Sequence, residues 1–254
     1  MLTAERRQRI VEVVETRRSV SVSELCKMMS VSDMTIRRDL KVLSDEGILE
    51  RVHGGALARD GAPKELPYLI RATEFINRKV AIGRRAAELI SEGSSIALDI
   101  GTTTLELAKV MARVPNLTVV TASLPVAEVL KNSPNIRLIL TGGLLRFEEF
   151  SLVGEFAERT FRDFRIDRAF VGAGGIDLQR GLTDYDQADI QVKKELISNS
   201  DQVTVLADSS KFSRTFPKAF APLSQVDTLV TDGDAPEEGL KMLTSMGIEV
   251  ILAE

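Results

Sequence analysis

The sequence predicts a mixed α/β protein with a small winged helix-turn-helix domain at its N-terminus and a larger domain built on a mainly parallel sheet. Two observations support this fold class. Three short helical segments and a glycine-containing extended segment follow one another within residues 1–57, and apolar strand-like runs alternate with helical segments from residue 74 onward. A chain of 254 residues is long enough to form two domains, each with its own core.

The composition is that of a soluble globular protein, with 44% hydrophobic and 28% charged residues. No apolar run approaches the roughly 20 residues that span a bilayer, and the first residues do not resemble a secretory signal, so we expect a cytoplasmic location. Cys26 is the only cysteine and His53 the only histidine. These counts exclude an internal disulfide and disfavour a zinc site with cysteine or histidine ligands, so we expect no metal, no cofactor and no catalytic residues.

The net charge of −4 is unevenly distributed along the chain. Residues 1–57 hold ten basic and nine acidic residues, whereas the remainder holds 23 basic and 28 acidic residues. Because affinity for nucleic acid depends on where the basic side chains lie, the overall negative charge does not exclude DNA binding.

Two helices are expected at the start of the chain. In the first, over residues 3–18, the apolar residues Ile10, Val13 and Val14 lie on one helical face. A short extended piece follows, and Ser23 is a candidate N-cap for a second helix that ends near residue 30.

The third helix, over residues 33–47, has a polar and basic outer face. Ser32 or Asp33 is its expected N-cap and Gly47 its C-terminal stop. Helical periodicity places Met34, Arg38 and Lys41 opposite the apolar stripe of this helix and Arg37 on its flank. A strand and a glycine turn over residues 48–56 would then form a wing. This arrangement is typical of a DNA-reading helix, and the expected contacts are Ser32, Asp33, Met34, Thr35, Arg37, Arg38 and Lys41 on the helix and Arg51 and His53 on the wing.

Two alternatives to DNA binding stay open from this pattern alone. The basic face of the third helix is also compatible with the solvated surface of a three-helix bundle. Winged helices also occur as protein-interaction modules, which would require Arg37 and Arg38 to be dispensable. Cys26 is interpreted as a small apolar filler of the second helix.

Residues 58–73 are predicted to be a linker, because the segment 54–72 has prolines and glycines but no regular periodicity. A helix is expected next, at about 74–91, with Arg78, Lys79, Arg84 and Arg85 on its polar face. Seven strands are predicted after it, separated by helical segments, at 95–100, 117–121, 136–141, 167–172, 203–207, 227–231 and 248–252.

The expected ligand site lies at loops that follow these strands, because parallel sheets bind ligands beyond the carboxyl ends of their strands. Asp99 precedes a turn from Gly101 to Thr104 where a helix begins, and such a turn suits an anion. Further loops contain Gly142-Gly143, Gly174 and Asp208 with Lys211. Each loop alone is also an ordinary strand-to-helix joint. A Walker loop and a G-x-G-x-x-G motif are missing, so a bound nucleotide is not suggested.

These residues resemble a known family over the whole chain. The run from Val31 to Leu40, which reads V-S-D-M-T-I-R-R-D-L, and the wing sequence R-V-H-G-G-A from Arg51 resemble the signature of the DeoR family of sugar-metabolism repressors. The sensor domain of that family is similar in fold to ribose-5-phosphate isomerase. The same resemblance extends to the loops at Asp99, Gly142, Gly174, Gly181 and Asp208 and to Lys193.

The resemblance implies operator DNA as one partner and a phosphorylated sugar as another. The turn Gly101, Thr102, Thr103 and Thr104 would hold the phosphate. Lys193 and Lys211 would reach phosphate or sugar oxygens. The remaining implied effector residues are Asp99, Gly142, Gly143, Gly174, Asp184 and Asp208. The chain has Thr121-Ala122-Ser123 where many relatives have Thr-Asn, so a contact from this loop is in doubt.

The alternative function is a sugar-phosphate isomerase with an accessory winged helix. Isomerisation needs a carboxylate base beside the substrate carbon. This chain has Val171–Gly175 where the isomerase has an acidic run, and Val192 precedes Lys193 where the isomerase has a glutamate. Glu195 lies about half a helical turn away and should face elsewhere.

We therefore expect a regulator rather than an enzyme, with a DNA-binding domain at 1–57, a linker at 58–73 and a sensor domain at 74–254. Because helix-turn-helix proteins bind paired half-sites, a homodimer or homotetramer is also expected.

Overall fold

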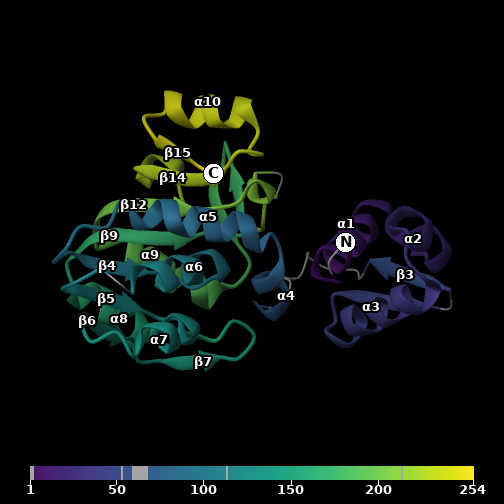
Figure 1. Cartoon of the computed structure of the whole chain (residues 1–254), viewed down its shortest axis with the longest axis horizontal. Coiled ribbons are helices and arrows are strands. Elements are labelled where there is room, and N and C mark those ends of the chain that lie inside the picture. Colours follow the sequence, from purple (N-terminus) through teal and green to yellow (C-terminus); the bar gives the residue numbers. More distant parts are fainter. Residues whose placement is uncertain (1–2, 53, 59–67, 113, 213) are drawn as a thin grey trace. The chain divides into compact units, whose positions relative to one another are not determined.

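A computed structural model describes residues 3–52, 54–58, 68–112, 114–212 and 214–254. The chain divides into two compact units, Met1–Phe75 and Ile76–Glu254. Each unit has its own hydrophobic core. Figure 1 shows the helices and strands of both units.

The N-terminal unit is a winged helix-turn-helix. Its elements are α1 (Thr3–Arg17), β1 (Ser19–Ser21), α2 (Val22–Met29), α3 (Asp33–Asp45), β2 (Leu49–Val52), β3 (Gly55–Ala58) and α4 (Tyr68–Thr73). The three strands form an antiparallel sheet in the order β1-β3-β2. Ile10, Leu25, Ile36 and Leu40 are fully buried in the core that the three main helices share.

The helix ends are set by local hydrogen bonds. Ser21 begins α2 with a capping box, in which its Oγ accepts the Glu24 N–H at 3.2 Å and Glu24 Oε2 accepts the Ser21 N–H at 2.9 Å. The predicted N-cap at Ser23 is therefore wrong by two residues. At the end of α3, Gly47 has φ +70, and the N–H groups of Gly47 and Ile48 bond to the Ser44 and Leu43 carbonyls. This Schellman arrangement gives Gly47 the predicted role of helix stop.

The predicted linker contains regular structure at both ends. β3 includes Ala58, and α4 packs Ile70 into the core of the N-terminal unit. No helix or strand was predicted within the linker 58–73, whereas Ala58 lies in β3 and residues 68–73 form α4. The reason is that α4 has only six residues, which is too short to show a clear period.

The second unit is a three-layer α/β domain. Seven parallel strands lie in the order β15-β14-β12-β9-β4-β5-β6. All seven predicted strands belong to this sheet, with ends that differ by up to three residues. Their bounds are Ser95–Leu98 for β4, Leu117–Thr121 for β5, Ile136–Leu140 for β6, Ile166–Gly172 for β9, Ser200–Leu206 for β12, Thr228–Asp232 for β14 and Glu249–Ala253 for β15.

Helices cover both faces of this sheet (Figure 1). One core lies beneath α5 (Ile76–Ala87), α6 (Thr102–Met111) and α7 (Leu124–Leu130), and the other beneath α8 (Glu155–Asp163), α9 (Gln187–Ser198) and α10 (Glu237–Ser245). Strand residues alternate between the two cores. Leu98 faces the first core and Ala97 the second, as the two-residue period of a strand requires.

Five short strands and two 3₁₀ turns complete the domain. β7 (Leu144–Arg146) and β8 (Ser151–Val153) form a hairpin, and β10 (Gly175–Asp177), β11 (Gly181–Asp184) and β13 (Lys218–Ala221) form a small antiparallel sheet. The 3₁₀ turns are Ser209–Lys211 and Leu223–Gln225. These strands have only three or four residues each and were not among the predicted elements.

Candidate functional sites

The first candidate site is the exposed face of α3. Ser32 is its N-cap, with Oγ 3.4 Å from the Thr35 backbone N, and the hydroxyls of Ser32 and Thr35 are 2.9 Å apart. Met34 is 80% exposed, and Arg37, Arg38 and Lys41 are exposed as well. The structure thus places the predicted helix residues together on one accessible surface, while Ile36 and Leu40 are buried behind them.

The charged residues of this surface are not equivalent. Arg37 forms a two-point ion pair with Asp33 one turn earlier, through Nε to Oδ1 and through Nη2 to Oδ2 at 3.2 Å. The hydrogen bond from Arg37 holds the pKa of Asp33 below its usual value. Within the described part of the chain, Arg38 and Lys41 have no ion-pair partner. Their charges are therefore available to an external anion.

The wing contributes one described residue of the predicted surface. Arg51 is exposed on β2, whose neighbour in the sheet is β3. His53 lies outside the described residues, so its predicted contact has no structural account.

A buried ion cluster that was not predicted connects α3 to α1. Asp39 is 1% exposed and accepts hydrogen bonds from Arg6 Nε at 2.6 Å and Arg7 Nε at 2.9 Å. A buried carboxylate requires such partners because desolvation is costly. The sequence contains one indication of this cluster: Asp39 precedes Leu40 on the inner face of α3, where a buried acidic residue needs a cationic partner.

The second candidate site lies where the order of the parallel sheet reverses. From β4 the chain passes to β5 and β6 on one side and then returns to β9, β12, β14 and β15 on the other. The order reverses between β4 and β9, and sheets of this type bind ligands beyond the carboxyl ends of the strands at such a point. Asp99 and Gly101 follow β4, and Gly174 follows β9.

A buried cluster of charges occupies this reversal point. Lys193 of α9 donates to Asp99 Oδ2 and to the Gly172 carbonyl at 3.0 Å, and its Nζ lies 3.4 Å from Asp184 Oδ2. Gly172 N–H donates to Asp99 at 2.9 Å. Burial raises the pKa of Asp99, although Lys193 opposes this effect. The structure thus brings together Asp99, Asp184 and Lys193, which were all predicted as effector residues. Each proton of the Lys193 ammonium has a protein acceptor nearby.

The turn after Asp99 presents an uncapped helix start. Gly101 has φ +132, a conformation that favours glycine, and α6 begins at the next residue without a side-chain cap. The first N–H groups of a helix have no partner within it, so this turn can accept an anion. Thr104 Oγ1 donates to the Gly101 carbonyl at 3.0 Å, which fixes the turn, and Thr102 and Thr103 are largely buried.

A second group of charges surrounds Asp208 at the end of β12. Burial raises the pKa of Asp208, but Lys211, Ser210 and Lys79 together lower it below its usual value. Asp208 Oδ1 accepts the Ser210 N–H at 3.0 Å, whereas Oδ2 is buried without a hydrogen-bond partner. A buried carboxylate oxygen without a donor suits a ligand hydroxyl.

Lys79 was misplaced by the sequence analysis. The prediction put it on the polar face of its helix, but it is only 3% exposed and lies close enough to Asp208 to lower its pKa. Its spacing to Ile76 and Ile82 places it on the inner face of α5, which is the signal that was missed. The neighbouring Arg78 donates to Ser209 Oγ at 2.7 Å and to Asp234 at 2.6 Å.

The predicted glycines have different surroundings. A side chain at Gly174 would lie 3.0 Å from Asp184 Oδ1 and from the Phe216 ring, so this glycine adjoins the charge cluster. Gly143 has φ +130, and a side chain there would lie 2.5 Å from the Val153 carbonyl. Gly142 and Gly143 follow β6, which is separated from β4 by β5. No described contact connects them to Asp99, and the close approach of β8 explains the glycine at 143.

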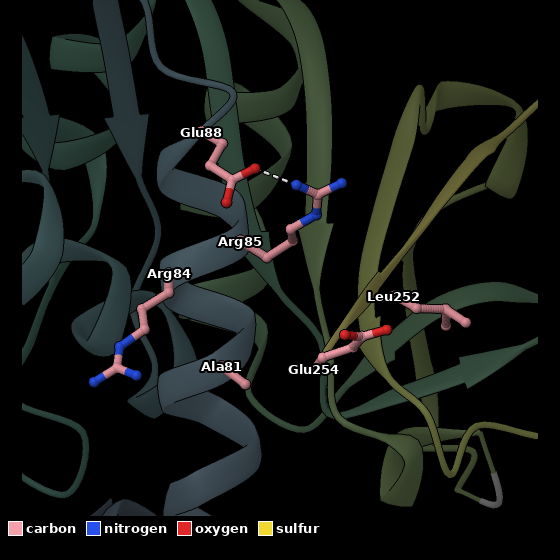
Figure 2. Close-up of a pocket in the computed structure, with 6 residues that line it drawn as sticks. All are labelled: Ala81, Arg84, Arg85, Glu88, Leu252 and Glu254. Carbon is pink, nitrogen blue, oxygen red and sulfur yellow. Dashed lines mark hydrogen bonds and ion pairs between the residues drawn. The ribbon is translucent and has the colours of Figure 1, made fainter.

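A hollow of about 380 Å³ lies elsewhere, between α5 and the end of β15. Figure 2 shows Ala81, Arg84 and Arg85 on α5, with Arg85 paired to Glu88, and Leu252 and Glu254 across from them. None of the predicted effector residues lines it.

In the described part of the chain, no helix is long and apolar enough to cross a membrane. Among the same residues, no three acidic, histidine or cysteine side chains lie close enough together to hold a metal ion.

A winged helix-turn-helix with an exposed basic helix, joined to an α/β domain with a buried charge cluster at the reversal point of its sheet, is typical of a DNA-binding regulator with a sensor domain. Comparisons with known proteins agree with this class. Residues 6–61 match the DeoR-like helix-turn-helix domain and residues 74–233 match the DeoR C terminal sensor domain. The chain belongs to the DeoR family of transcriptional regulators.

Named relatives cover nearly the whole chain. The chain is 34% identical over 252 residues to the glycerol-3-phosphate regulon repressor of Escherichia coli K12, covering 99% of this chain and 100% of the relative. It is 32% identical to the putative aga operon transcriptional repressor of Escherichia coli O157:H7, covering 98% and 94%. A structure of D-ribose-5-phosphate isomerase in complex with phospho-erythronic acid aligns over 54% of each chain, with 17% identity and a TM-score of 0.41. The relatives are named as regulators, which supports the non-enzyme prediction.

Proposed function

We propose that this protein represses a carbohydrate-utilisation operon by binding its operator, and that a phosphorylated sugar or sugar alcohol releases it. The observation that carries the proposal is the presence in one chain of an exposed basic helix, α3, and a group of polar and charged residues at the reversal point of the sensor sheet. We further propose that it acts in the cytoplasm, as a homodimer or homotetramer that engages paired half-sites.

On DNA, α3 would enter the major groove with its N-terminal turn nearest the bases. Ser32, Asp33, Met34 and Thr35 form that turn. Arg38 and Lys41, whose charges have no ion-pair partner among the described residues, would contact phosphates, and Arg37 would exchange Asp33 for a phosphate or a guanine edge. Arg51 and His53 would contact the backbone from the wing.

In the sensor domain, the turn from Gly101 to Thr104 would hold the phosphate, and Lys211 and Lys79, which both lower the pKa of Asp208, would supply positive charge to the site. Asp208 Oδ2 lacks a donor and would accept a sugar hydroxyl. Asp99, Asp184 and Lys193 already satisfy one another, so they would contact the effector only after exchanging one of these bonds. Contacts from Gly142, Gly143 and Gly174 stay predictions.

The isomerase alternative is less well supported. Glu195, the glutamate nearest to Lys193 along the chain, pairs with Arg162 of α8 at 3.3 Å rather than with the charge cluster. No acidic residue occurs in the loop at 171–175. A carboxylate base positioned as in the isomerase is therefore missing.

A DNA-binding assay tests the first half of the proposal. We expect the protein to retard DNA from upstream of its own operon, and expect Arg37→Ala/Arg38→Ala to abolish the shift. Affinity should fall by about one power of salt concentration for each phosphate contact. Arg165→Ala/Arg180→Ala, which changes two exposed arginines of the sensor domain, is the control. Equal DNA binding by both double variants would contradict the proposal.

A thermal-shift assay tests the second half. A panel of sugar phosphates, together with glycerol 3-phosphate because a relative bears that name, should contain a compound that raises the melting temperature of the protein, since a ligand bound only by the folded state stabilises it. Lys79→Met and Lys211→Met should each reduce the shift, whereas Lys131→Met, at an exposed lysine of the α7 C-cap, should not. Conversion of a sugar phosphate at enzymatic rates would overturn the proposal.

A further inference from the structure

The ion pair at the start of α3 uses only one edge of the Arg37 guanidinium. Its Nε donates to Asp33 Oδ1, and its Nη2 donates to Asp33 Oδ2 at 3.2 Å. A guanidinium has one N–H on Nε and two on each terminal nitrogen, all in one plane. The pair therefore leaves one N–H of Nη2 and both of Nη1 unused. Among the residues that the structure describes, Arg37 has no other hydrogen bond or ion pair.

The unused edge of Arg37 has the geometry that reads a guanine. Guanine presents N7 and O6 side by side in the major groove, and two parallel N–H groups of an arginine can bind both acceptors at once. Arg37 lies one turn after the start of α3, in the part of a reading helix that approaches the bases. The side chains of Arg37 and Asp33 are 48% and 59% exposed. The free edge can therefore bind a base while the ion pair stays intact.

The start of the helix holds Asp33 in a suitable position. Asp33 is the first residue of α3, directly after the N-cap Ser32, so its carboxylate lies near the positive end of the helix dipole. An exposed ion pair of this kind contributes little to stability, because it orders two flexible side chains. The same ordering helps binding, since an arginine that is already held in one orientation loses less conformational entropy when it contacts a base.

We propose that Asp33 is a positioning residue that directs Arg37 to a guanine in the operator. The pair carries no net charge and so attracts phosphates weakly, whereas Arg38 and Lys41, without ion-pair partners among the described residues, supply that attraction. Of the two Arg37 contacts considered above, this selects the guanine edge and needs no exchange of Asp33. The inference rests on the operator binding proposed above and adds the residue pair that gives it sequence specificity.

Selection from DNA duplexes with a randomised central segment, at low ionic strength, tests the inference. The wild type should enrich sequences with a fixed guanine, and replacement of that guanine should weaken binding by roughly 5–150-fold. In Arg37→Ala the factor should fall below about 3-fold at this base pair, and in Asp33→Ala it should fall as far although Arg37 is present. Asp33→Glu, which keeps a carboxylate one turn from Arg37, should keep most of the preference.

Binding to a duplex of unrelated sequence distinguishes positioning from damage to the helix. Asp33→Ala removes a negative charge and releases Arg37 to phosphates, so its affinity for this duplex should rise and its salt dependence should steepen by about one power. A variant that only disturbs α3 would bind every duplex more weakly. Asp45→Ala, which removes an exposed carboxylate at the other end of α3, is the matched control and should keep the guanine preference. Thermal unfolding checks that all variants are folded.

The possible results separate this inference from the function on which it rests. A wild type that enriches no sequence would overturn operator binding and the inference together. An undiminished guanine preference in Asp33→Ala would overturn the inference alone. So would a loss at a base pair that Arg37→Ala does not affect, because Asp33 would then accept from a cytosine itself.

A modified base gives a second measurement on the same contact. Replacement of the selected guanine by 7-deazaguanine, which lacks the N7 acceptor, should weaken binding by the wild type and leave binding by Arg37→Ala unchanged. Equal weakening of both proteins would contradict the contact between Arg37 and this guanine.

Discussion

The segment from Arg37 to Asp39 of α3 has two roles: its arginines are exposed for DNA, and Asp39 anchors the helix to α1. Arg37 and Arg38 are exposed, whereas the next residue, Asp39, turns inward to Arg6 and Arg7 of α1. The inward carboxylate holds the helix while the outward guanidinium groups stay accessible. The charge pattern of this segment is therefore partly structural, and only the exposed face concerns DNA.

The first prediction concerns this buried cluster. Asp39→Asn removes the charge that neutralises Arg6, which is only 8% exposed, and should destabilise the N-terminal unit by about 3–5 kcal/mol, as expected when one partner of a buried ion pair is lost. Urea unfolding followed by circular dichroism measures this change. Asp45→Asn, at an exposed position of the same helix, should change the stability by less than about 0.5 kcal/mol. Similar values for the two variants would mean that the cluster is not important for stability.

At the scale of elements, the close contact between α5 and α6 depends on one glycine. A side-chain carbon at Gly83 would lie 2.7 Å from the Leu107 backbone nitrogen and 2.8 Å from the Glu106 carbonyl carbon. These neighbours are backbone atoms of α6, which cannot move without shifting the whole helix. Because α6 begins at the proposed phosphate turn, this contact also fixes the position of that turn.

The second prediction follows from this contact. Gly83→Ala should destabilise the sensor domain by about 1–3 kcal/mol, since overpacking outweighs the roughly 1 kcal/mol by which alanine favours a helix. Gly233→Ala is a matched control, because nothing lies within 4 Å of a side chain there and its backbone is not left-handed. Thermal unfolding of both variants gives the comparison. A stabilised Gly83→Ala would contradict the packing described here.

The elements differ in how far the sequence predicts them. The seven strands of the parallel sheet were all predicted, because strands buried on both faces form continuous apolar runs, and 117–121 matches β5 at both ends. The short strands β7, β8, β10, β11 and β13 have too few residues for a period. Within the sites, the loop residues at strand ends were predicted, but the partners of Lys193 and Lys79 were not. These pairs join segments distant in sequence, and periodicity carries no information on them.

At the scale of the whole molecule, the two sites lie in separate compact units. A regulator of this design works only if the effector binds the DNA-competent and DNA-incompetent states with different affinity. The effect of the effector on operator binding must then equal the effect of the operator on effector binding.

The third prediction is this reciprocity. If a sugar phosphate weakens operator binding by a given factor, saturation with operator DNA should weaken effector binding by the same factor, typically 5–150-fold. Fluorescence anisotropy of labelled DNA and calorimetric titration of the effector measure the two factors independently. Tighter operator binding in the presence of effector would contradict the proposed release of repression.

Lys79 lies in the first turn of α5, four residues after the boundary at Phe75. It is buried beside Asp208, where the proposed effector would sit. A metabolite that alters the charge balance around Lys79 therefore acts within one helical turn of the segment that carries the DNA reader. In the proposed regulator, the effector would thus act on a residue only four positions along the sequence from the boundary of the DNA-binding unit.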